Sequence, residues 1–322
     1  MKLRCRICNN ESGNRLHQVR EMMFGLRDEF EYLECASCKC VQIVEVPASM
    51  SKYYPANYYS FAPIPNRGRL LKLLLKLRNR YALSGRGVIG KLLHRVAPPK
   101  LPLSSLAPLE LEHDANILDV GCGRGLLLSA LGELGFDNLL GIDPFLAADV
   151  EDENGVLLLK KTIHDVTGEF DLIMLHHAFE HISDPEETLR TVGKLLPPGG
   201  SCIIRIPTVS SYAWQHYKTN WVQLDAPRHF YIHSLESMKI LADRAGLELE
   251  SVVYDSSAFQ FWGSEQYVAD IPLMDSRSYS VSPKESLFTR KQISAFEKRA
   301  MELNHAKLGD QAAFYVRKDS VA

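Results

Sequence analysis

Residues 117–125 read Ile-Leu-Asp-Val-Gly-Cys-Gly-Arg-Gly, and this stretch decides the fold class. The branched apolar residues around Asp119 predict a short buried strand. The glycines after it predict a turn almost without side chains, and the leucines from 126 to 134 recur at helical spacing. The unit is therefore a strand, a glycine turn and a helix, in which a ligand can lie directly on the backbone at the helix N-terminus.

Further apolar runs follow at intervals that leave room for helices between them. The run 138–143 ends in Asp143, about two dozen residues past the turn, where a nucleoside-binding domain needs an acceptor for two ribose hydroxyls. Strands are also predicted at 156–159, 170–175, 202–207, 247–254 and 312–316, and helices at 185–196, 235–245 and 291–308. The alternation predicts a doubly wound parallel α/β sheet with its ligand crevice at the carboxyl ends of the strands.

The motifs, taken in this order, resemble those of class I S-adenosylmethionine-dependent methyltransferases over roughly residues 110–255. The shared motifs are Asp-x-Gly-x-Gly-x-Gly from residue 119, Gly-Ile-Asp-Pro from 141, Phe-Asp-Leu-Ile from 170, Glu-His-x-x-Asp-Pro from 180 and Leu-Leu-Pro-Pro-Gly-Gly from 195. The resemblance implies a seven-stranded Rossmann-like sheet, an enzyme that transfers a methyl group, and S-adenosylmethionine as its cofactor.

The resemblance also implies which residues contact the cofactor. Asp143 would bind the ribose hydroxyls, and His176 and His177 would face the methyl group. Pro144 and Phe145 would flank the adenine, and the glycine turn would border the methionine part through Asp119, Gly121, Cys122, Gly123 and Gly125. Many relatives have an acid after the third strand that meets the adenine amine, and this chain departs from them with Thr-Ile-His-Asp at 162–165.

Composition excludes several classes of protein. The 322 residues are 46% hydrophobic, which suffices for a full core, and the net charge of −2 gives no global attraction to nucleic acid or anionic lipid. No stretch approaches 18 consecutive apolar residues, and the N-terminus has no apolar signal region. We therefore expect a cytoplasmic protein.

The cysteines near the N-terminus are arranged in two matched pairs. Cys5-x-x-Cys8 and Cys35-x-x-Cys38 are separated by 26 residues, which suits four thiolates around one structural zinc ion. We expect a zinc-ribbon-like module over 1–45 with a strand at 30–33, and Cys40 as a spare. Reduced thiols without metal, or a redox pair, are the alternatives. A closed four-thiolate site has no open position, so the module is expected to frame the acceptor site or bind a partner.

The connector over 46–108 is basic and rich in leucine. Between residues 59 and 100 there is no acid but there are ten cations, namely Arg67, Arg69, Lys72, Lys76, Arg78, Arg80, Arg86, Lys91, Arg95 and Lys100. This pattern predicts one or two basic amphipathic helices. The leucines either pack on the main domain, or residues 67–95 contact a membrane surface that carries a lipid-linked acceptor, or the cations bind phosphate or nucleic acid.

Residues 176–181, His-His-Ala-Phe-Glu-His, contain a His-x-x-Glu-His motif of metallopeptidases, but that motif requires a helix and this one follows a buried strand. In methyltransferases that resemble the ubiquinone-pathway O-methyltransferases, a Glu-x-x-Glu-His stretch here is associated with a divalent ion. His177 stands where their first Glu would be, which argues against a metal at that point. Alternatively, Glu180 and His181 are structural, cap the next helix and bond to each other.

Two aromatic inserts, 208–233 and 255–309, interrupt the expected methyltransferase domain over 109–322. The first contains Trp221 and then Asp-Ala-Pro-Arg-His at 225–229, a pattern that resembles methyltransferases of sugar, polysaccharide and natural-product pathways. Its aromatic faces suit a sugar or aromatic ring, Arg228 suits a phosphate or carboxylate, and His229 could be a general base. A rigid loop held by an Asp225–Arg228 pair is the alternative.

The sequence thus predicts a methyltransferase that acts on a small or lipid-linked acceptor, with the hydroxyl of a sugar or polysaccharide precursor as the expected target. The expected catalytic residues are His177, His229 and Arg228, with either histidine as the base. An RNA methyltransferase is disfavoured because base-methylating enzymes present Asn/Asp-Pro-Pro-Tyr/Phe after the fourth strand. A non-catalytic partner-binding protein is disfavoured by the intact glycine turn and Asp143.

Overall fold

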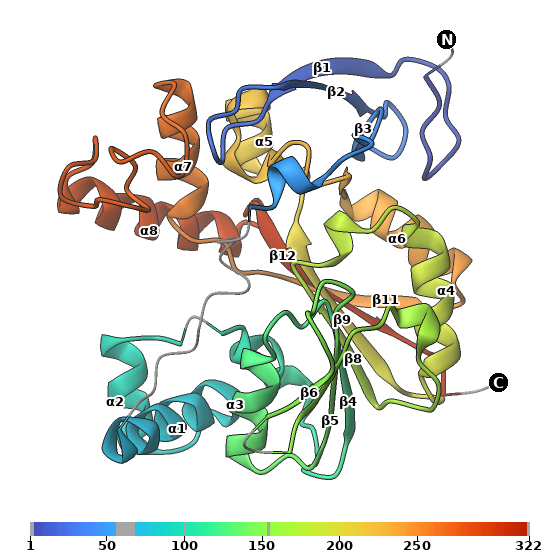
Figure 1. Ribbon diagram of the computed structural model, residues 1–322, viewed down its shortest axis with the longest axis vertical. Helices are drawn as coiled ribbons and strands as arrows, with labels where there is room; N and C mark the ends of the chain where they lie inside the picture. Colours follow the sequence, from blue (N-terminus) through green and yellow to red (C-terminus); the bar gives the residue numbers. More distant parts are fainter. Residues whose placement is uncertain (1–2, 56–67, 100, 153–154, 321–322) are drawn as a thin grey trace. The chain divides into compact units, whose positions relative to one another are not determined.

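The computed structural model describes residues 3–55, 68–99, 101–152 and 155–320 and contains two compact units (Figure 1). One unit comprises Met1–Pro55, His177–Leu189 and Arg205–Val316, and the other comprises Ala56–His176, Arg190–Ile204 and Arg317–Ala322. The units interleave along the chain, whereas the segments 1–45, 46–108 and 109–322 expected from the sequence follow it linearly. That linear division stays a prediction about domain organisation.

The second unit is built around the predicted strand, glycine turn and helix. β4 (Asn116–Val120) leads through the turn into α3 (Leu126–Leu134), and it pairs in parallel with β5 (Asn138–Ile142) and β8 (Leu172–His176). β7 (Leu157–Leu159) pairs in parallel with β5, and the strand order is β9-β8-β4-β5-β7-β6. These elements confirm the predicted doubly wound topology, because the central strands are short and largely apolar and can be buried on both faces.

Within the described residues the sheet has eight strands, one more than the seven expected. β6 (Val150–Glu151) pairs antiparallel with β7 and brings the sheet to eight strands. Its two residues are exposed and carry no apolar pattern, so periodicity could not predict them.

The first unit contains further strands and helices, and β9 (Ser201–Pro207) has residues in both units. Here the strand order is β11-β12-β9, with β11 at Glu248–Tyr254 and β12 at Gln311–Arg317. α4 (Pro185–Leu195) precedes β9 in the chain, α6 (Leu235–Arg244) begins at a Ser234 cap, and α8 (Arg290–His305) begins at a Thr289 cap. Two helices lie inside the predicted inserts, α5 (Tyr212–Tyr217) and α7 (Phe259–Val268).

A small antiparallel sheet forms the N-terminal part of the first unit. Its order is β1-β2-β3-β10, with bounds Arg15–Arg20, Glu29–Glu34, Val41–Ile43 and Tyr231–Ile232. β2 confirms the strand predicted at 30–33. β10 belongs to the first insert and pairs with β3 through Tyr231–Gln42 and Ile232–Val41. The ribbon-like segment therefore shares a sheet with the loop expected to hold the acceptor.

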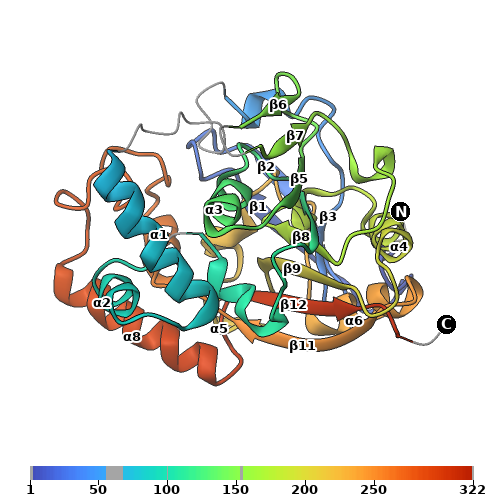
Figure 2. The same ribbon diagram turned by 90° about the horizontal axis from the view of Figure 1, so that it is seen from below.

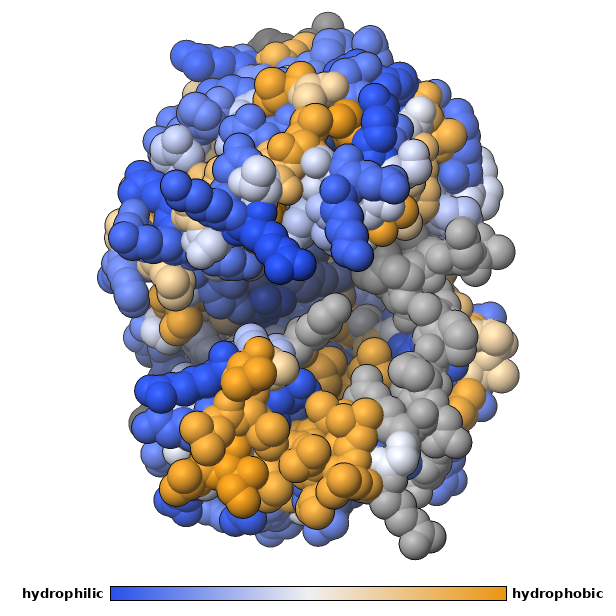
Figure 3. Space-filling view, turned by 90° about the vertical axis from the view of Figure 1, so that its left-hand side faces the viewer, coloured by the Kyte–Doolittle hydropathy of each residue, from blue (hydrophilic) through white to orange (hydrophobic). Residues whose placement is uncertain are grey.

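The basic connector contains two helices, α1 (Arg69–Ser84) and α2 (Val88–Val96), as predicted (Figures 1 and 2). They pack closely at Gly90, where an added Cβ would lie 2.4 Å from the Leu77 carbonyl oxygen. Packing covers only part of their apolar surface, and the exposed residues gather in a patch (Figure 3): Leu70, Leu71, Leu73, Val88, Ile89, Leu92 and Val96. Among the described residues, no helix is long and apolar enough to cross a bilayer.

Candidate functional site

The glycine turn after β4 has a backbone that only glycine adopts without strain. Gly121, Gly123 and Gly125 have positive φ values of 74°, 53° and 68°. The N–H groups of Gly121 and Cys122 donate to the Ile142 carbonyl oxygen at 2.8 and 3.1 Å. The turn is thereby held against the end of β5, and no Cβ at its three glycines obstructs a ligand.

Asp143 follows β5 directly and also holds the turn. One carboxylate oxygen accepts from Gly123 N at 3.0 Å, and the other accepts from Phe145 N at 2.8 Å. Each oxygen has a second lone pair, which is the capacity that two ribose hydroxyls require. Pro144 is exposed and Phe145 is 76% exposed, so both are accessible from solvent, as residues that flank an adenine must be. The expected ribose and adenine residues thus adjoin the turn.

Burial changes the protonation of Asp119 and Cys122. Burial, together with the charge of Asp143, raises the pKa of Asp119 to about 7. Burial also raises the pKa of Cys122, so its thiol is protonated and serves as lining rather than as a nucleophile. His176 ends β8, two residues after Met174, which pairs with Asp119. The nine expected cofactor residues thus come from β4, the turn after it, the residues that follow β5 and the end of β8.

Residues 162–165, after the third predicted strand, do not provide the acid that meets the adenine amine in many relatives. The Asp165 carboxylate accepts hydrogen bonds from the backbone N–H and hydroxyl of Thr162, at 3.1 and 2.7 Å. Asp165 therefore forms part of a capping box of the short helical turn Ile163–Asp165, in which Thr162 is the N-cap residue.

A buried carboxylate organises the histidines of the first unit. Glu180 lies in the turn Phe179–His181 and is completely buried. Nδ1 of His177 lies 3.2 Å from Glu180 Oε1, while Arg205 Nη1 lies 2.8 Å from His177 Nε2. Because a guanidinium can only donate, Nε2 of His177 is the acceptor and its Nδ1 carries the proton. Arg205 is itself paired with Asp255. The lone pair of His177 is therefore engaged by Arg205.

The other two histidines around Glu180 are held by backbone carbonyl groups. His229 Nδ1 lies 2.8 Å from the Gln223 carbonyl oxygen, and His181 Nδ1 lies 2.8 Å from that of Arg228. Both rings therefore carry their proton on Nδ1 and their lone pair on Nε2. Burial and the neighbouring His181 lower the pKa of His229 to about 4, so its imidazole is neutral at pH 7.

The structure supports the alternative in which Arg228 pairs with Asp225 and holds a rigid loop, rather than contact of Arg228 with an acceptor anion. Its guanidinium is fully buried and donates to both oxygens of Asp225, at 2.8 and 2.6 Å. It also donates to Glu21 Oε1 at 2.9 Å and to the Tyr53 carbonyl oxygen at 3.2 Å. With its donors engaged, Arg228 positions the loop 225–229. Sequence reasoning missed Glu21 and Tyr53, because no spacing pattern links residues so far apart in the chain.

The expected aromatic surface of the first insert is not available to a sugar ring at Trp221. This side chain is completely buried, and its Nε1 donates to Asp310 Oδ2 at 2.9 Å. Trp214 and Tyr217 are buried as well. These aromatic residues form core rather than a stacking platform, which corrects the expectation for this insert.

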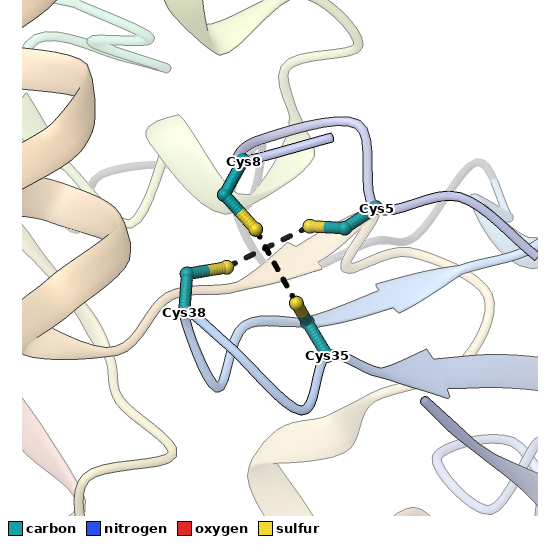
Figure 4. Close-up of side chains that lie close together, drawn as sticks. All are labelled: Cys5, Cys8, Cys35 and Cys38. Carbon is teal, nitrogen blue, oxygen red and sulfur yellow. Dashed lines mark hydrogen bonds between the residues drawn. The ribbon is translucent and has the colours of Figure 1, made fainter. Parts of the chain in front are cut away.

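The four paired cysteines converge on one point (Figure 4). Their sulfur atoms lie within 4.8 Å of one another, with Cys5–Cys38 at 3.6 Å and Cys8–Cys35 at 3.4 Å. A tetrahedral zinc site with 2.3 Å bonds has sulfur atoms about 3.8 Å apart, so this donor set fits zinc. Cys40 is buried and lies outside the cluster, as expected for a spare thiol.

The two cysteine knuckles have the same local backbone. The residue four positions after each first cysteine, Asn9 or Lys39, has a positive φ near 60°. Its N–H donates to the carbonyl oxygen of Cys5 or Cys35, at 2.9 and 3.1 Å. This repeated turn brings each pair of thiols to the same side of its loop, so both knuckles are shaped to bind one ion.

The ribbon holds the loop that carries His229. Tyr32 donates its hydroxyl to the His229 carbonyl oxygen at 2.8 Å, and Ile43 N donates to the Phe230 carbonyl oxygen at 2.9 Å. Together with Glu21 and Tyr53 around Arg228, these contacts tie the N-terminal segment to residues 225–230. The ribbon therefore frames the histidine cluster, in line with the expected scaffold role.

Comparisons with known proteins agree with this geometry. A family model described as a methyltransferase domain matches residues 84–252, just over half of the chain, and the chain belongs to this family. It is an S-adenosylmethionine-dependent methyltransferase.

A ubiquinone biosynthesis O-methyltransferase of Xanthomonas oryzae pv. oryzae is 24% identical over 207 residues, or 58% of this chain and 87% of that protein. The mitochondrial ubiquinone biosynthesis O-methyltransferase of Homo sapiens is 29% identical over 158 residues, or 43% of this chain and 42% of that protein. A methyltransferase structure from Mesorhizobium loti aligns with a TM-score of 0.42 at 17% identity, over 68% of this chain and 99% of that chain.

Proposed function

We propose that this methyltransferase acts on a hydroxyl oxygen of a small or lipid-linked acceptor. The observation that carries the proposal is the histidine cluster around Glu180, which begins immediately after β8. A hydroxyl must lose its proton as it accepts a methyl group, and a neutral imidazole beside the reacting oxygen suits that task. The two O-methyltransferases named above support oxygen as the acceptor atom.

The chain's residues mainly have to align the reactants. The sulfonium of S-adenosylmethionine is already an activated methyl donor, so catalysis requires the acceptor oxygen, the methyl carbon and the sulfur to lie in line. Of the two histidines expected as the base, His177 uses its Nε2 lone pair on Arg205. Within the described part of the chain, Nε2 of His229 makes no hydrogen bond, with Asp225 Oδ2 at 3.8 Å and Glu180 Oε1 at 4.0 Å. His229 therefore keeps a lone pair available and His177 does not.

The finer identity of the acceptor rests on different evidence. The main structural argument for a sugar or polysaccharide precursor was an aromatic face at Trp221 on which a sugar ring could stack. The side chain of Trp221 is buried, so this argument does not hold. We therefore favour an acceptor that joins a hydroxyl to an apolar chain, which agrees with relatives named for ubiquinone biosynthesis. Sugars linked to a lipid remain members of this class.

The patch on α1 and α2 supports peripheral contact with an anionic membrane surface. On α2, residues 88, 89, 92 and 96 fall within an arc of about 100°, and the exposed cations Lys91 and Arg95 lie beside it. Lys72, Lys76 and Arg80 are exposed on α1. An exposed apolar arc flanked by cations matches the interface of anionic lipids, in which apolar side chains enter the acyl region and cations meet headgroups.

Structural zinc at Cys5, Cys8, Cys35 and Cys38 completes the proposal. The sulfur distances and the matched knuckles support it. The ion would hold the ribbon in the shape that braces the loop 225–230, without taking part in methyl transfer.

The function is tested by methyl transfer from labelled S-adenosylmethionine to a panel of acceptors. The panel contains alkyl and polyprenyl phenols, lipid-linked sugars, nucleotide sugars and RNA. The proposal predicts label in a hydroxyl acceptor with an apolar chain. Label in RNA, or in nucleotide sugars alone, would contradict it. Asp143→Ala serves as the variant in which transfer should fail through lost cofactor binding.

A further inference from the structure

Arg205 lies in β9 and donates a hydrogen bond to one of the histidines around Glu180. We propose that Arg205 is a positioning residue for methyl transfer. Through His177, it holds the Glu180 carboxylate where that carboxylate stabilises an imidazolium at His229. This role rests on the proposed function, in which His229 takes the proton of an acceptor hydroxyl. All four residues belong to the first unit.

The guanidinium of Arg205 is itself fixed by a carboxylate of the second insert. Asp255 Oδ2 accepts from Arg205 Nε at 2.5 Å, and Asp255 Oδ1 accepts from Gln311 Nε2 at 2.9 Å. The Arg205 side chain is 16% exposed, so this ion pair is largely shielded from solvent. Arg205 Nη1 donates to His177 Nε2 at 2.8 Å. The planar guanidinium therefore joins Asp255 to His177 in a defined orientation.

His177 is held in one tautomer and in an uncommon backbone conformation. Its N–H donates to the Arg205 carbonyl oxygen at 2.9 Å, and its φ is 51°. Left-handed backbone costs energy for a residue other than glycine, and such strain is concentrated at functional sites. Because Nε2 accepts from Arg205, Nδ1 carries the proton and donates to Glu180 Oε1 at 3.2 Å. Arg205 thus fixes the tautomer that provides Glu180 with a donor.

Glu180 depends on this hydrogen bond to remain charged. The residue is completely buried, and within the described part of the chain its other oxygen, Oε2, has no hydrogen-bond partner. Burial alone would raise the pKa of Glu180, but the hydrogen bond from His177 and the neighbouring histidines lower it to about 2. Without that bond the effect of burial would dominate, and the carboxylate would take up a proton more readily.

The carboxylate lies beside the nitrogen on which positive charge would form. In the proposed reaction the acceptor oxygen bonds to the methyl carbon as the bond from that carbon to sulfur breaks, and the hydroxyl proton passes to His229 Nε2. This nitrogen lies 4.0 Å from Glu180 Oε1 and 3.8 Å from Asp225 Oδ2. Two carboxylates at such distances favour the imidazolium, which later releases its proton to solvent. Arg205 therefore acts on the reaction through His177 and Glu180 without contacting the acceptor oxygen.

The first test measures the His177 tautomer and needs no turnover. Nitrogen-15 nuclear magnetic resonance of histidine-labelled protein distinguishes a proton on Nδ1 from one on Nε2, and His177→Asn assigns the signals. The wild type should carry the proton on Nδ1. Arg205→Leu should move much of it to Nε2, whereas Arg205→Lys, which can still donate to Nε2, should keep the wild-type pattern. A wild-type proton on Nε2, or an unchanged pattern in Arg205→Leu, would overturn the proposal.

The second test measures methyl transfer by the same variants. In Arg205→Leu, kcat should fall by about tenfold or more, part of the roughly 100-fold or more that a positioned base contributes. The KM values for S-adenosylmethionine and acceptor should stay within about twofold. Arg205→Lys should recover most of kcat. Arg299→Leu removes the same charge from an exposed ion pair with Glu302 on α8 and should transfer methyl groups like the wild type.

The pH profile separates positioning from loss of structure. The ionisable groups that face Glu180 are His177, His181, His229 and His233. As the pH is lowered from about 8 to about 6, kcat of Arg205→Leu should fall because Glu180 becomes protonated, whereas wild-type kcat should stay level. A lower melting temperature in Arg205→Leu with an unchanged pH profile and no recovery in Arg205→Lys would overturn the proposal. A wild type that methylates no hydroxyl acceptor, yet shows the expected tautomers, would count against the proposed function alone.

Discussion

At the scale of single residues, Asp143 links the cofactor site to the fold. It fixes the glycine turn through Gly123 N and follows β5, so it shapes the turn and would also bind the ribose. Asp143→Ala should weaken S-adenosylmethionine binding by roughly 2–3 kcal/mol, or about thirty-fold to over a hundred-fold. Isothermal titration measures this affinity, and Asp137→Ala, an exposed neighbour, is the control. Unchanged affinity in Asp143→Ala would remove Asp143 from the cofactor site.

Asp119 makes stability depend on pH in a direction that can be checked. Its pKa rises from an ordinary 3.8 to about 7 in the folded chain. Folding therefore favours its protonated form, and this contribution to stability is lost as pH rises from about 4 through 7. Asp119→Asn should gain stability relative to the wild type by up to about 4 kcal/mol between pH 4 and pH 8. Urea unfolding at several pH values measures the difference, and a difference that does not vary with pH would contradict the assignment.

Local sequence patterns point to the residues expected at the cofactor site, whereas no local pattern reveals the partners of Arg228. Asp119, the glycines and Asp143 are identified by local patterns, because a strand, a turn and a helix follow one another within about 25 residues. Arg228 is instead defined by Glu21 and Tyr53, which are distant in the chain. A buried arginine and an exposed one look the same in a sequence, so anion binding was a reasonable expectation that burial then disfavoured.

At the scale of secondary-structure elements, α1 and α2 carry the membrane hypothesis. If their patch meets anionic lipid, the protein should sediment with anionic vesicles at low salt and be released as salt rises. Lys72→Glu, Lys76→Glu and Arg80→Glu together should weaken vesicle binding by about 100-fold or more, since each cation near the surface contributes about 1 kcal/mol. Lys284→Glu, Lys291→Glu and Lys298→Glu change the net charge equally at exposed sites elsewhere and should retain binding. An equal loss of vesicle binding in both triple variants would contradict a specific role of α1, because the effect would then depend on net charge alone.

If zinc holds the ribbon in shape, loss of the ion should also affect residues 225–231, which are far from the ribbon in sequence. Cys35→Ser should lower the zinc content and loosen β1 to β3, and it should also speed hydrogen exchange in residues 225–231, because Tyr32 and Ile43 hold that loop. S-adenosylmethionine affinity should change little. Cys40→Ser, which alters a buried thiol outside the cluster, is the control. Purified protein without zinc, or exchange in the loop that does not respond, would contradict this scaffold role.

Elements with a strong local period were predictable, and those stabilised only by distant partners were not. α6 and α8 begin at serine and threonine caps that the sequence displays. α7 is buried on most sides, so no polar stripe indicated a helix. β10 has two residues and exists because β3 pairs with it, which no pattern within 208–233 could show.

At the scale of the whole molecule, the two units carry different groups of the expected site residues. The unit with β4, β5 and β8 provides the glycine turn and Asp143, and the unit with the ribbon provides Glu180 and its histidines. The linear sequence conceals this division, because the chain passes between the units at residues 176 and 177, in the middle of one histidine pair. Cofactor binding and acceptor activation should therefore be separable by mutation.

The central claim is that the transferred methyl group ends on oxygen. Carbon-13 nuclear magnetic resonance of the product made from methyl-labelled S-adenosylmethionine tests it directly, because methyl groups on oxygen, nitrogen and carbon resonate in distinct regions. We expect a single O-methyl signal on a hydroxyl acceptor, present with the wild type and absent with Asp143→Ala. A labelled product with the methyl group on nitrogen or carbon would contradict it.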